Sequence, residues 1–195
     1  MRPNGKSLLL AAKPLVAVLA LVLAAALSGH ATRAGDTGGS GALDRLFAQL
    51  KVAPDADAAR KIESQIWAIW TEPKDPVLAG KMSDLLSAVQ ADDLKAAMSL
   101  ANAIVKAWPH YAEGWNQRAT IEYMRGQVAA SLADIAETLK LEPRHFGAIS
   151  GRILIELQRG ERSGALKDLR TVLKLDPYAK ERTLFPGLLP PPTRT

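Results

Sequence analysis

The chain has 195 residues, 48% of them hydrophobic, which is enough for one domain with an ordinary core and too apolar for a disordered protein. It has no cysteine, which excludes disulfides, thiolate chemistry and a lipid anchor attached through cysteine. The formal net charge is +5. Four of the 25 basic residues and none of the 20 acidic ones lie in residues 1–34, so the rest of the chain holds 21 basic and 20 acidic residues. A nearly neutral remainder without a basic stripe argues against nucleic acid as a partner.

Residues 1–34 have the pattern of a signal peptide. Three basic residues precede the apolar segment 14–27, and small residues follow, so we expect cleavage after Ala31 or Ala34. The apolar segment has fourteen residues, whereas a membrane-spanning helix needs about twenty. The sequence therefore predicts an exported, periplasmic protein. The alternative is an uncleaved segment that anchors the chain in the inner membrane.

A flexible linker and a helical pair are expected next. Residues 35–41, "GDTGGSG", have linker composition. Within residues 42–76, apolar residues follow helical spacing in two segments, and Asp55 is placed to cap the second. We interpret this pair as an irregular N-terminal repeat or cap, since the end of a helical array must cover an apolar face that no neighbour buries.

Three features then recur with a period of 34 residues. Helix stops fall at Pro109, Pro143 and Pro177. Polar breaks suited to tight turns fall at Asp92, Gly126 and Gly160. Small residues that allow close approach of helices fall at Ala97, Ser131 and Ala165. The pattern predicts three units of two antiparallel helices.

The period resembles that of the tetratricopeptide repeat family. In the middle unit the matching residues are Trp115, Ala119, Ser131, Ile135 and Pro143. Arg118 and Glu122 replace the Leu and Tyr of the family pattern. The resemblance implies an all-α fold, a right-handed α-solenoid of antiparallel helix pairs. Its repeats would occupy residues 77–178, at about 78–111, 112–145 and 146–178.

Residues 179–195 offer only a short capping turn and a proline-rich tail. We therefore expect the apolar face of Leu166, Leu169 and Leu173 to be incompletely covered. The four tryptophans, Trp67, Trp70, Trp108 and Trp115, are expected to pack between adjacent hairpins. For Trp115→Ala this predicts a loss of about 3–5 kcal/mol.

The resemblance also implies a concave groove, lined by the first helix of each unit, that accepts a peptide or a partner helix. The predicted partner-binding residues are Met82, Leu86, Asn116, Thr120, Tyr123, Ser150 and Leu154. Of the basic and amide residues with which some family members clamp a C-terminal carboxylate, this groove offers only Asn116. A carboxylate clamp is therefore not expected.

The sequence shows no catalytic or cofactor-binding motif. His110 and His145 lie in turns between units and lack partners at metal-ligand spacing, so we expect them to contact the neighbouring hairpin. No phosphate loop, nucleophile elbow or paired-carboxylate motif is present. We expect a non-catalytic protein-binding module without metal or cofactor. The alternative is a structural or assembly subunit held at the inner membrane.

Overall fold

The structure is a computed structural model that describes residues 39–187. These residues form eight α-helices and one 3₁₀ helix, without strands. The elements in chain order are α2 (Gly39–Lys51), α3 (Ala56–Thr71), α4 (Pro76–Gln90), α5 (Leu94–Ala107), α6 (Ala112–Met124), α7 (Val128–Leu141), α8 (Phe146–Gln158), α9 (Arg162–Leu175) and η2 (Lys180–Leu184). The predicted signal peptide and the end of the tail lie outside the described residues.

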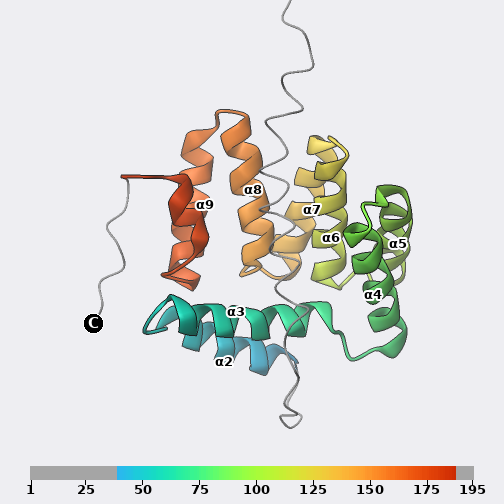
Figure 1. Cartoon of the computed structure of the whole chain (residues 1–195), viewed down its shortest axis with the longest axis horizontal. Helices are drawn as coiled ribbons and strands as arrows, with labels where there is room; N and C mark the ends of the chain where they lie inside the picture. Colours follow the sequence, from blue (N-terminus) through green and yellow to red (C-terminus); the bar gives the residue numbers. More distant parts are fainter. Residues whose placement is uncertain (1–38, 188–195) are drawn as a thin grey trace, which may run out of the picture.

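Helices α4 to α9 form three antiparallel hairpins that stand side by side in a row (Figure 1). Within each hairpin the two helices are in contact, and α5 packs on α6 as α7 packs on α8. The small residues Ala97, Ser131 and Ala165 are all buried. This is the expected all-α solenoid of antiparallel helix pairs.

The three turns inside the hairpins share one backbone geometry. Asp92, Gly126 and Gly160 have φ values of 57°, 76° and 75°. After each of them, a backbone N–H donates to the carbonyl five residues earlier, at Ala88, Glu122 and Glu156. These are the bonds of a helix C-cap with one left-handed residue. The period seen in the sequence is therefore a repeated C-cap.

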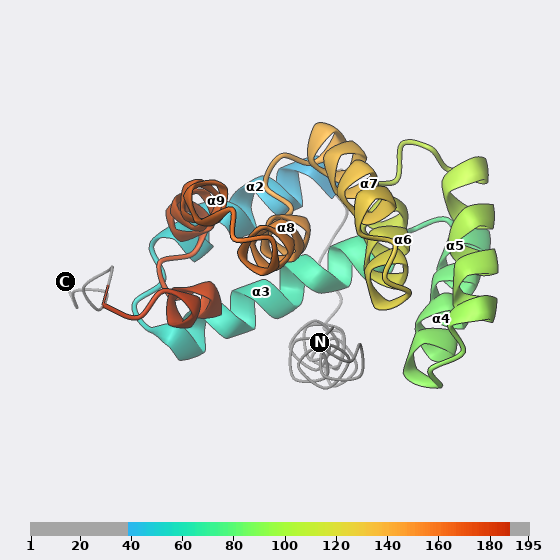
Figure 2. The same ribbon diagram turned by 90° about the horizontal axis from the view of Figure 1, so that it is seen from above.

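The α2–α3 hairpin does not stack in series as a further repeat. Figures 1 and 2 show it lying across the row, at one end of the repeat helices. Trp67 and Trp70 of α3 are buried against Phe146 at the start of α8. Because this aromatic stripe needs a large apolar partner, it docks on the third unit, far away in the chain. The hairpin therefore does not extend the array as a further repeat; it lies across the array and packs on the second and third units.

The predicted boundary of the linker is three residues too late. Helix α2 begins at Gly39, inside the stretch 35–41. The first N–H groups of a helix have no intrahelical partner, so glycine and serine cost less there than in the interior.

The C-terminal apolar face is covered in part. Leu169 is fully buried, and Leu166 and Leu173 pack into the same cluster as Phe185, which follows η2. The Arg162 guanidinium lies over the Phe185 ring, 5.6 Å from its centroid. Leu166 and Leu173 stay half-buried, so the expectation of incomplete cover holds for these two residues, while the 3₁₀ helix and Phe185 cover the rest of the face.

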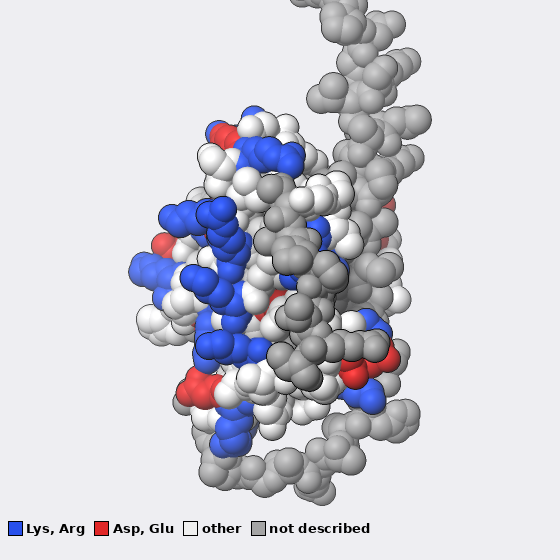
Figure 3. All heavy atoms as spheres, turned by 90° about the vertical axis from the view of Figure 1, so that its left-hand side faces the viewer, with Lys and Arg blue, Asp and Glu red and all other residues white. Residues whose placement is uncertain are grey.

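The outer face of α9 is basic. Figure 3 shows lysine and arginine side chains gathered on the side of the molecule where α9 lies. Lys167, Arg170 and Lys174 are exposed and lie at helical spacing on one face. The expectation that the chain lacks a basic stripe is thus wrong for α9, because an overall charge balance does not show where charges lie. Like charges on this face oppose its stacking on a second copy of itself.

Candidate functional site

The predicted groove residues of the first unit belong mainly to its core. Met82 is fully buried with Leu78 and Leu85, and Leu86 is half-buried against the same cluster. Met82 was therefore wrongly predicted as a partner-binding residue. The apolar stripe of α4 faces its own hairpin partner α5 and the following helix α6.

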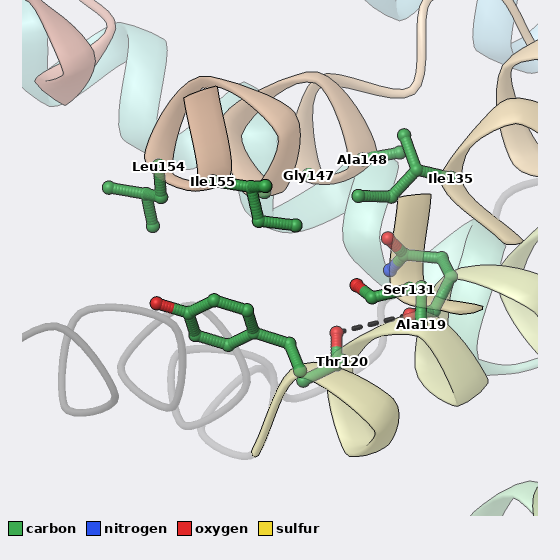
Figure 4. A pocket seen from close by; sticks show the side chains of 11 residues that line it. Ala119, Thr120, Ser131, Ile135, Gly147, Ala148, Leu154 and Ile155 are labelled. Carbon is green, nitrogen blue, oxygen red and sulfur yellow. Dashed lines mark hydrogen bonds between the residues drawn. The ribbon is translucent and has the colours of Figure 1, made fainter. Parts of the chain in front are cut away.

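The predicted residues of the second and third units line two adjoining hollows. The smaller one, between α6, α7 and α8, has about 20 Å³, which is room for one water. Asn116, Thr120, Tyr123 and Leu154 line it. Figure 4 shows Thr120 on one side of this hollow and Leu154 on the other. The Tyr123 hydroxyl accepts a hydrogen bond of 2.6 Å from the Gln158 side-chain amide, which ties α6 to α8.

The larger hollow, here called the α3 cleft, has a volume of about 320 Å³. Residues from α3, α6, α8, the end of α9 and η2 line it. Asn116, Thr120 and Ser150 are the predicted groove residues in this cleft. Its size is at the lower end of the range for pockets that take small ligands or side chains.

Three aromatic and three acidic side chains dominate the α3 cleft. The aromatic ones are Trp67, Phe146 and Tyr178, and the acidic ones are Glu63, Asp176 and Glu181. The cleft thus has aromatic side chains in its walls and acidic ones from α3, η2 and the residue after α9, with the basic residues Arg60 and Lys180 also in its lining.

A buried network around His145 fixes the elements that form the cleft. The His145 ring caps α8 by accepting a bond of 3.2 Å from the Ala148 N–H at Nδ1. That tautomer leaves the Nε2 proton for the Glu113 carboxylate of α6, 2.8 Å away. Trp70 of α3 stacks on the same ring, with centroids 4.0 Å apart. His145 therefore joins α3, α6 and α8 at one point, and the expectation that it contacts a neighbouring hairpin is confirmed.

Glu113 is saturated with donors. Besides His145 it accepts from the side-chain amides of Asn116 and Gln117 on its own helix. Glu113 and His145 are almost completely buried. Since Asn116 is engaged here and only 6% exposed, it shapes the wall of the cleft more than it offers free hydrogen bonds.

The carboxylates of the cleft influence one another. Burial, together with the charges of Asp176 and Glu181, raises the pKa of Glu63 to about 7. Burial also raises the pKa of Asp176, although its carboxylate accepts a bond from the Tyr178 backbone N–H. Glu63 and Asp176 are hydrogen-bonded to each other, so they share a proton near neutral pH.

A second polar pattern repeats in the last two hairpins. Arg118 makes a two-pronged ion pair with Asp134, at 2.6 and 2.8 Å. One period later Arg152 pairs with Asp168 in the same way, at 2.5 and 2.9 Å. These pairs cross-link the two helices of each hairpin. They explain why arginine stands where the family pattern has leucine.

Glu122, the other departure from the pattern in the middle unit, and Glu156, 34 residues later, lie next to these pairs. Burial and the neighbouring aspartate raise the pKa of each of them. One oxygen of each is buried without a hydrogen-bond partner in the described residues. The repeated Arg, Glu and Asp positions thus form one recurring unit, in which the glutamate is buried at Glu122 and half-buried at Glu156.

Trp115 does not have the expected place. It is half-buried and lies outside the core clusters of residues 39–187. Its indole N–H donates a hydrogen bond of 2.9 Å to the Pro109 carbonyl, and the Arg118 guanidinium lies over its ring. The loss predicted for Trp115→Ala is accordingly too large. Trp67 and Trp70 are buried as expected, and Trp108 is half-buried against the core of the first hairpin.

Comparison with known proteins supports the repeat assignment. The chain is 37% identical over 109 residues to a TPR repeat-containing protein of Rhizobium etli, and this match covers 56% of the chain and 53% of the relative. The chain is thus similar to a tetratricopeptide repeat protein, and the antiparallel helix pairs of the described residues agree with that likeness. The chain spans about half the length of that relative. No family model matches the chain, and no solved structure matches it.

Tetratricopeptide arrays are typically non-catalytic protein-interaction modules. Within the described ranges, no three histidine, aspartate or glutamate side chains are placed to hold a metal ion. Likewise, none of the helices described is long and apolar enough to cross a membrane.

Sequence reasoning missed the residues that give the α3 cleft its charge. Glu63, Asp176 and Glu181 come from three elements and have no common spacing. They meet because α3 lies across the array, which no local pattern reveals. The Arg–Asp pairs could have been found, since Arg118 and Arg152, like Asp134 and Asp168, are each 34 residues apart.

Proposed function

We propose that the chain binds a segment of another protein in the α3 cleft, without catalysis. The observation that carries this proposal is a cleft of about 320 Å³ on a tetratricopeptide array, with aromatic walls and a charged end. A groove formed by rigid helices suits capture of an extended peptide or a helix, because the receptor loses little conformational entropy on binding.

The site differs from the groove implied by the family resemblance. Its first wall is the transverse helix α3, and its other walls are α6 and α8 with η2. Thr120 and Ser150 are the predicted residues that we retain as partner contacts, and Asn116 supports the wall. The first hairpin supplies none of the residues that line either hollow.

The test is selection of binding peptides from a random heptapeptide library displayed on phage, with the full chain as the target. Ser64→Trp should abolish the selected binding, because Ser64 is exposed on α3 and lines the cleft, which an indole would fill. Ser87→Trp is the matched control. Ser87 is also exposed and, like Ser64, donates to the carbonyl four residues earlier, but on α4 outside the cleft.

Two results would contradict the proposal. One is that no peptide is selected. The other is that the selected peptides bind Ser64→Trp as tightly as they bind Ser87→Trp, which would place binding elsewhere.

We further propose that the protein acts in the cell envelope. Support comes from residues 1–34, whose charge and apolar pattern is that of a signal peptide. N-terminal sequencing of the protein from cells separates two forms: a start near Thr32 or Gly35 supports export with cleavage. An intact N-terminus in the membrane fraction would favour the anchored structural or assembly subunit instead.

A further inference from the structure

Three carboxylates that influence one another line one end of the α3 cleft. Glu63 comes from α3, Asp176 follows α9, and Glu181 lies on η2. Asp176 accepts one backbone N–H and shares a hydrogen bond with Glu63. These three side chains therefore bring up to three negative charges to one side of a single cleft.

Glu181 is the most informative of the three. It is only 7% exposed and lines the cleft, yet among residues 39–187 no donor or basic side chain is paired with it. Neither of its oxygens is among the buried side-chain atoms that lack a partner in these residues, so the carboxylate is open to the cleft, where a cation would supply a counter-charge and hydrogen bonds. Glu181 thus points to a cationic group that enters the cleft.

The walls next to this acidic end suit the apolar part of such a group. Trp67, Phe146 and Tyr178 line the cleft, together with the small residues Ala59 and Ala179. Aromatic faces attract ammonium and guanidinium groups, and they pack well against methylene stems.

We infer that the α3 cleft receives a lysine or arginine side chain of the bound polypeptide, with Glu181 and the Glu63–Asp176 pair as its counter-charges. This inference rests on the proposed function and names the chemistry that the partner must present. In residues 39–187 the carboxylates are not grouped around one point as a metal ion would require, so a side-chain cation is the better fit.

Lys180 competes with the incoming group. It is exposed at the cleft and lowers the pKa of Glu63 through its charge. Arg60, the other basic residue that lines the cleft, is already paired with Asp57. Removing the Lys180 charge should therefore strengthen binding of a basic side chain, which a purely structural role of this surface would not predict.

Binding should also depend on pH. The charged groups that face Glu63 are Asp176 beyond α9, Glu181 and Lys180 on η2, and Arg60 on α3 itself; α6 and α8 contribute only uncharged residues to the cleft. A cation next to Glu63 favours its ionised form, so binding releases the shared proton. Affinity should rise between pH 6 and pH 8.

The test is a double-mutant cycle on the peptides selected from the heptapeptide library. Lysine or arginine should be enriched at one position of these peptides. Replacing that residue by glutamine should weaken binding to the unmodified chain about tenfold or more, as expected for a charge-assisted contact. Glu181→Gln should weaken the basic peptide by a similar factor and leave the glutamine peptide unchanged. Lys180→Ala should tighten the basic peptide, and Glu72→Gln, an exposed change outside the cleft, should change neither.

Separate outcomes overturn the inference and the proposed function. If the selected peptides bind the cleft but show no basic position, or if Glu181→Gln weakens both peptides equally, the cation site is wrong and peptide binding stands. If Ser64→Trp does not affect the selected peptides, the proposed function falls and the inference falls with it.

Discussion

The first hairpin, α4–α5, and the two that follow it have the same turns but different interiors. All three turn through a left-handed residue with the same C-cap bonds. The interior of α4–α5 is apolar, whereas the other two hairpins each contain an Arg–Asp pair, and they alone form the α3 cleft with the transverse hairpin. The repeat period and the chemistry of the hairpin interiors are thus separate properties. Residues in the turns determine the period, and residues within the helices determine the chemistry.

The largest expected effect comes from breaking one Arg–Asp pair. Arg152→Ala leaves Asp168, only 6% exposed, without its cation, and should lower the free energy of unfolding by about 2–3 kcal/mol near pH 8. Asp84 of α4 is at the position equivalent to Arg152, and its side chain is exposed. Asp84→Ala should change the free energy of unfolding by less than about 0.5 kcal/mol. Urea unfolding followed by circular dichroism measures both. Equal losses in the two variants would show that the pair does not distinguish the hairpins.

Docking of the transverse hairpin can be broken at Gly147. A Cβ at this position would lie 2.6 Å from a ring carbon of Trp67, so Gly147→Ala should push the indole away and cost about 1–3 kcal/mol. On α4, a Cβ at Gly80 meets no atom within 4 Å. Gly80→Ala should therefore stabilise the chain by up to about 1 kcal/mol through helix propensity. Thermal unfolding with near-ultraviolet circular dichroism reports both effects, and a Gly147→Ala protein as stable as the parent would contradict the docked position of Trp67.

The shared turn geometry predicts opposite effects of two small changes. Gly126→Ala forces an L-residue into the left-handed region and should cost about 1 kcal/mol. Asp92→Gly relieves the same cost in the first hairpin and should stabilise by up to about 1 kcal/mol. Changes of the same sign in chemical unfolding would mean that the two turns are not equivalent.

A further expected effect is a pH dependence that belongs to the cleft. The pKa of Glu63 is raised in the folded state to about 7, so folding favours its protonated form. The stability that this gives is present below the ordinary glutamate pKa near 4.5 and is lost as the pH rises through 7. The unfolding temperature should therefore fall between pH 5 and pH 8, and Glu63→Gln should flatten that decline. If the unfolding temperature of Glu63→Gln depended on pH as strongly as that of the unmodified chain, Glu63 would not be the source of the pH dependence.

Sequence patterns predicted what depends on local chemistry. Proline stops such as Pro143 and left-handed turn residues such as Gly126 act within a few residues of themselves, so the hairpins and their period could be inferred. The buried place of Met82 could not, because the core and the groove sides of a short apolar helix have the same composition.

The transverse position of α2–α3 depends on contacts between residues about 80 positions apart, such as Trp67 with Phe146. It also depends on the hydrogen bond of 2.8 Å from the Tyr178 hydroxyl to the Pro54 carbonyl, which joins residues 124 positions apart. No periodicity relates such residues. Thr120 and Ser150 could be proposed as groove residues because they belong to repeat units. The carboxylates of the α3 cleft could not, because no periodicity relates them.

The central claim is that a polypeptide binds in the α3 cleft, and hydrogen exchange with a selected peptide tests it most directly. The full chain should gain protection in α3, α6 and α8, and in residues 176–184, while α4 and α5 exchange as in the free protein. Protection confined to the α4–α5 hairpin or to the basic face of α9, with none in the elements of the cleft, would contradict the account.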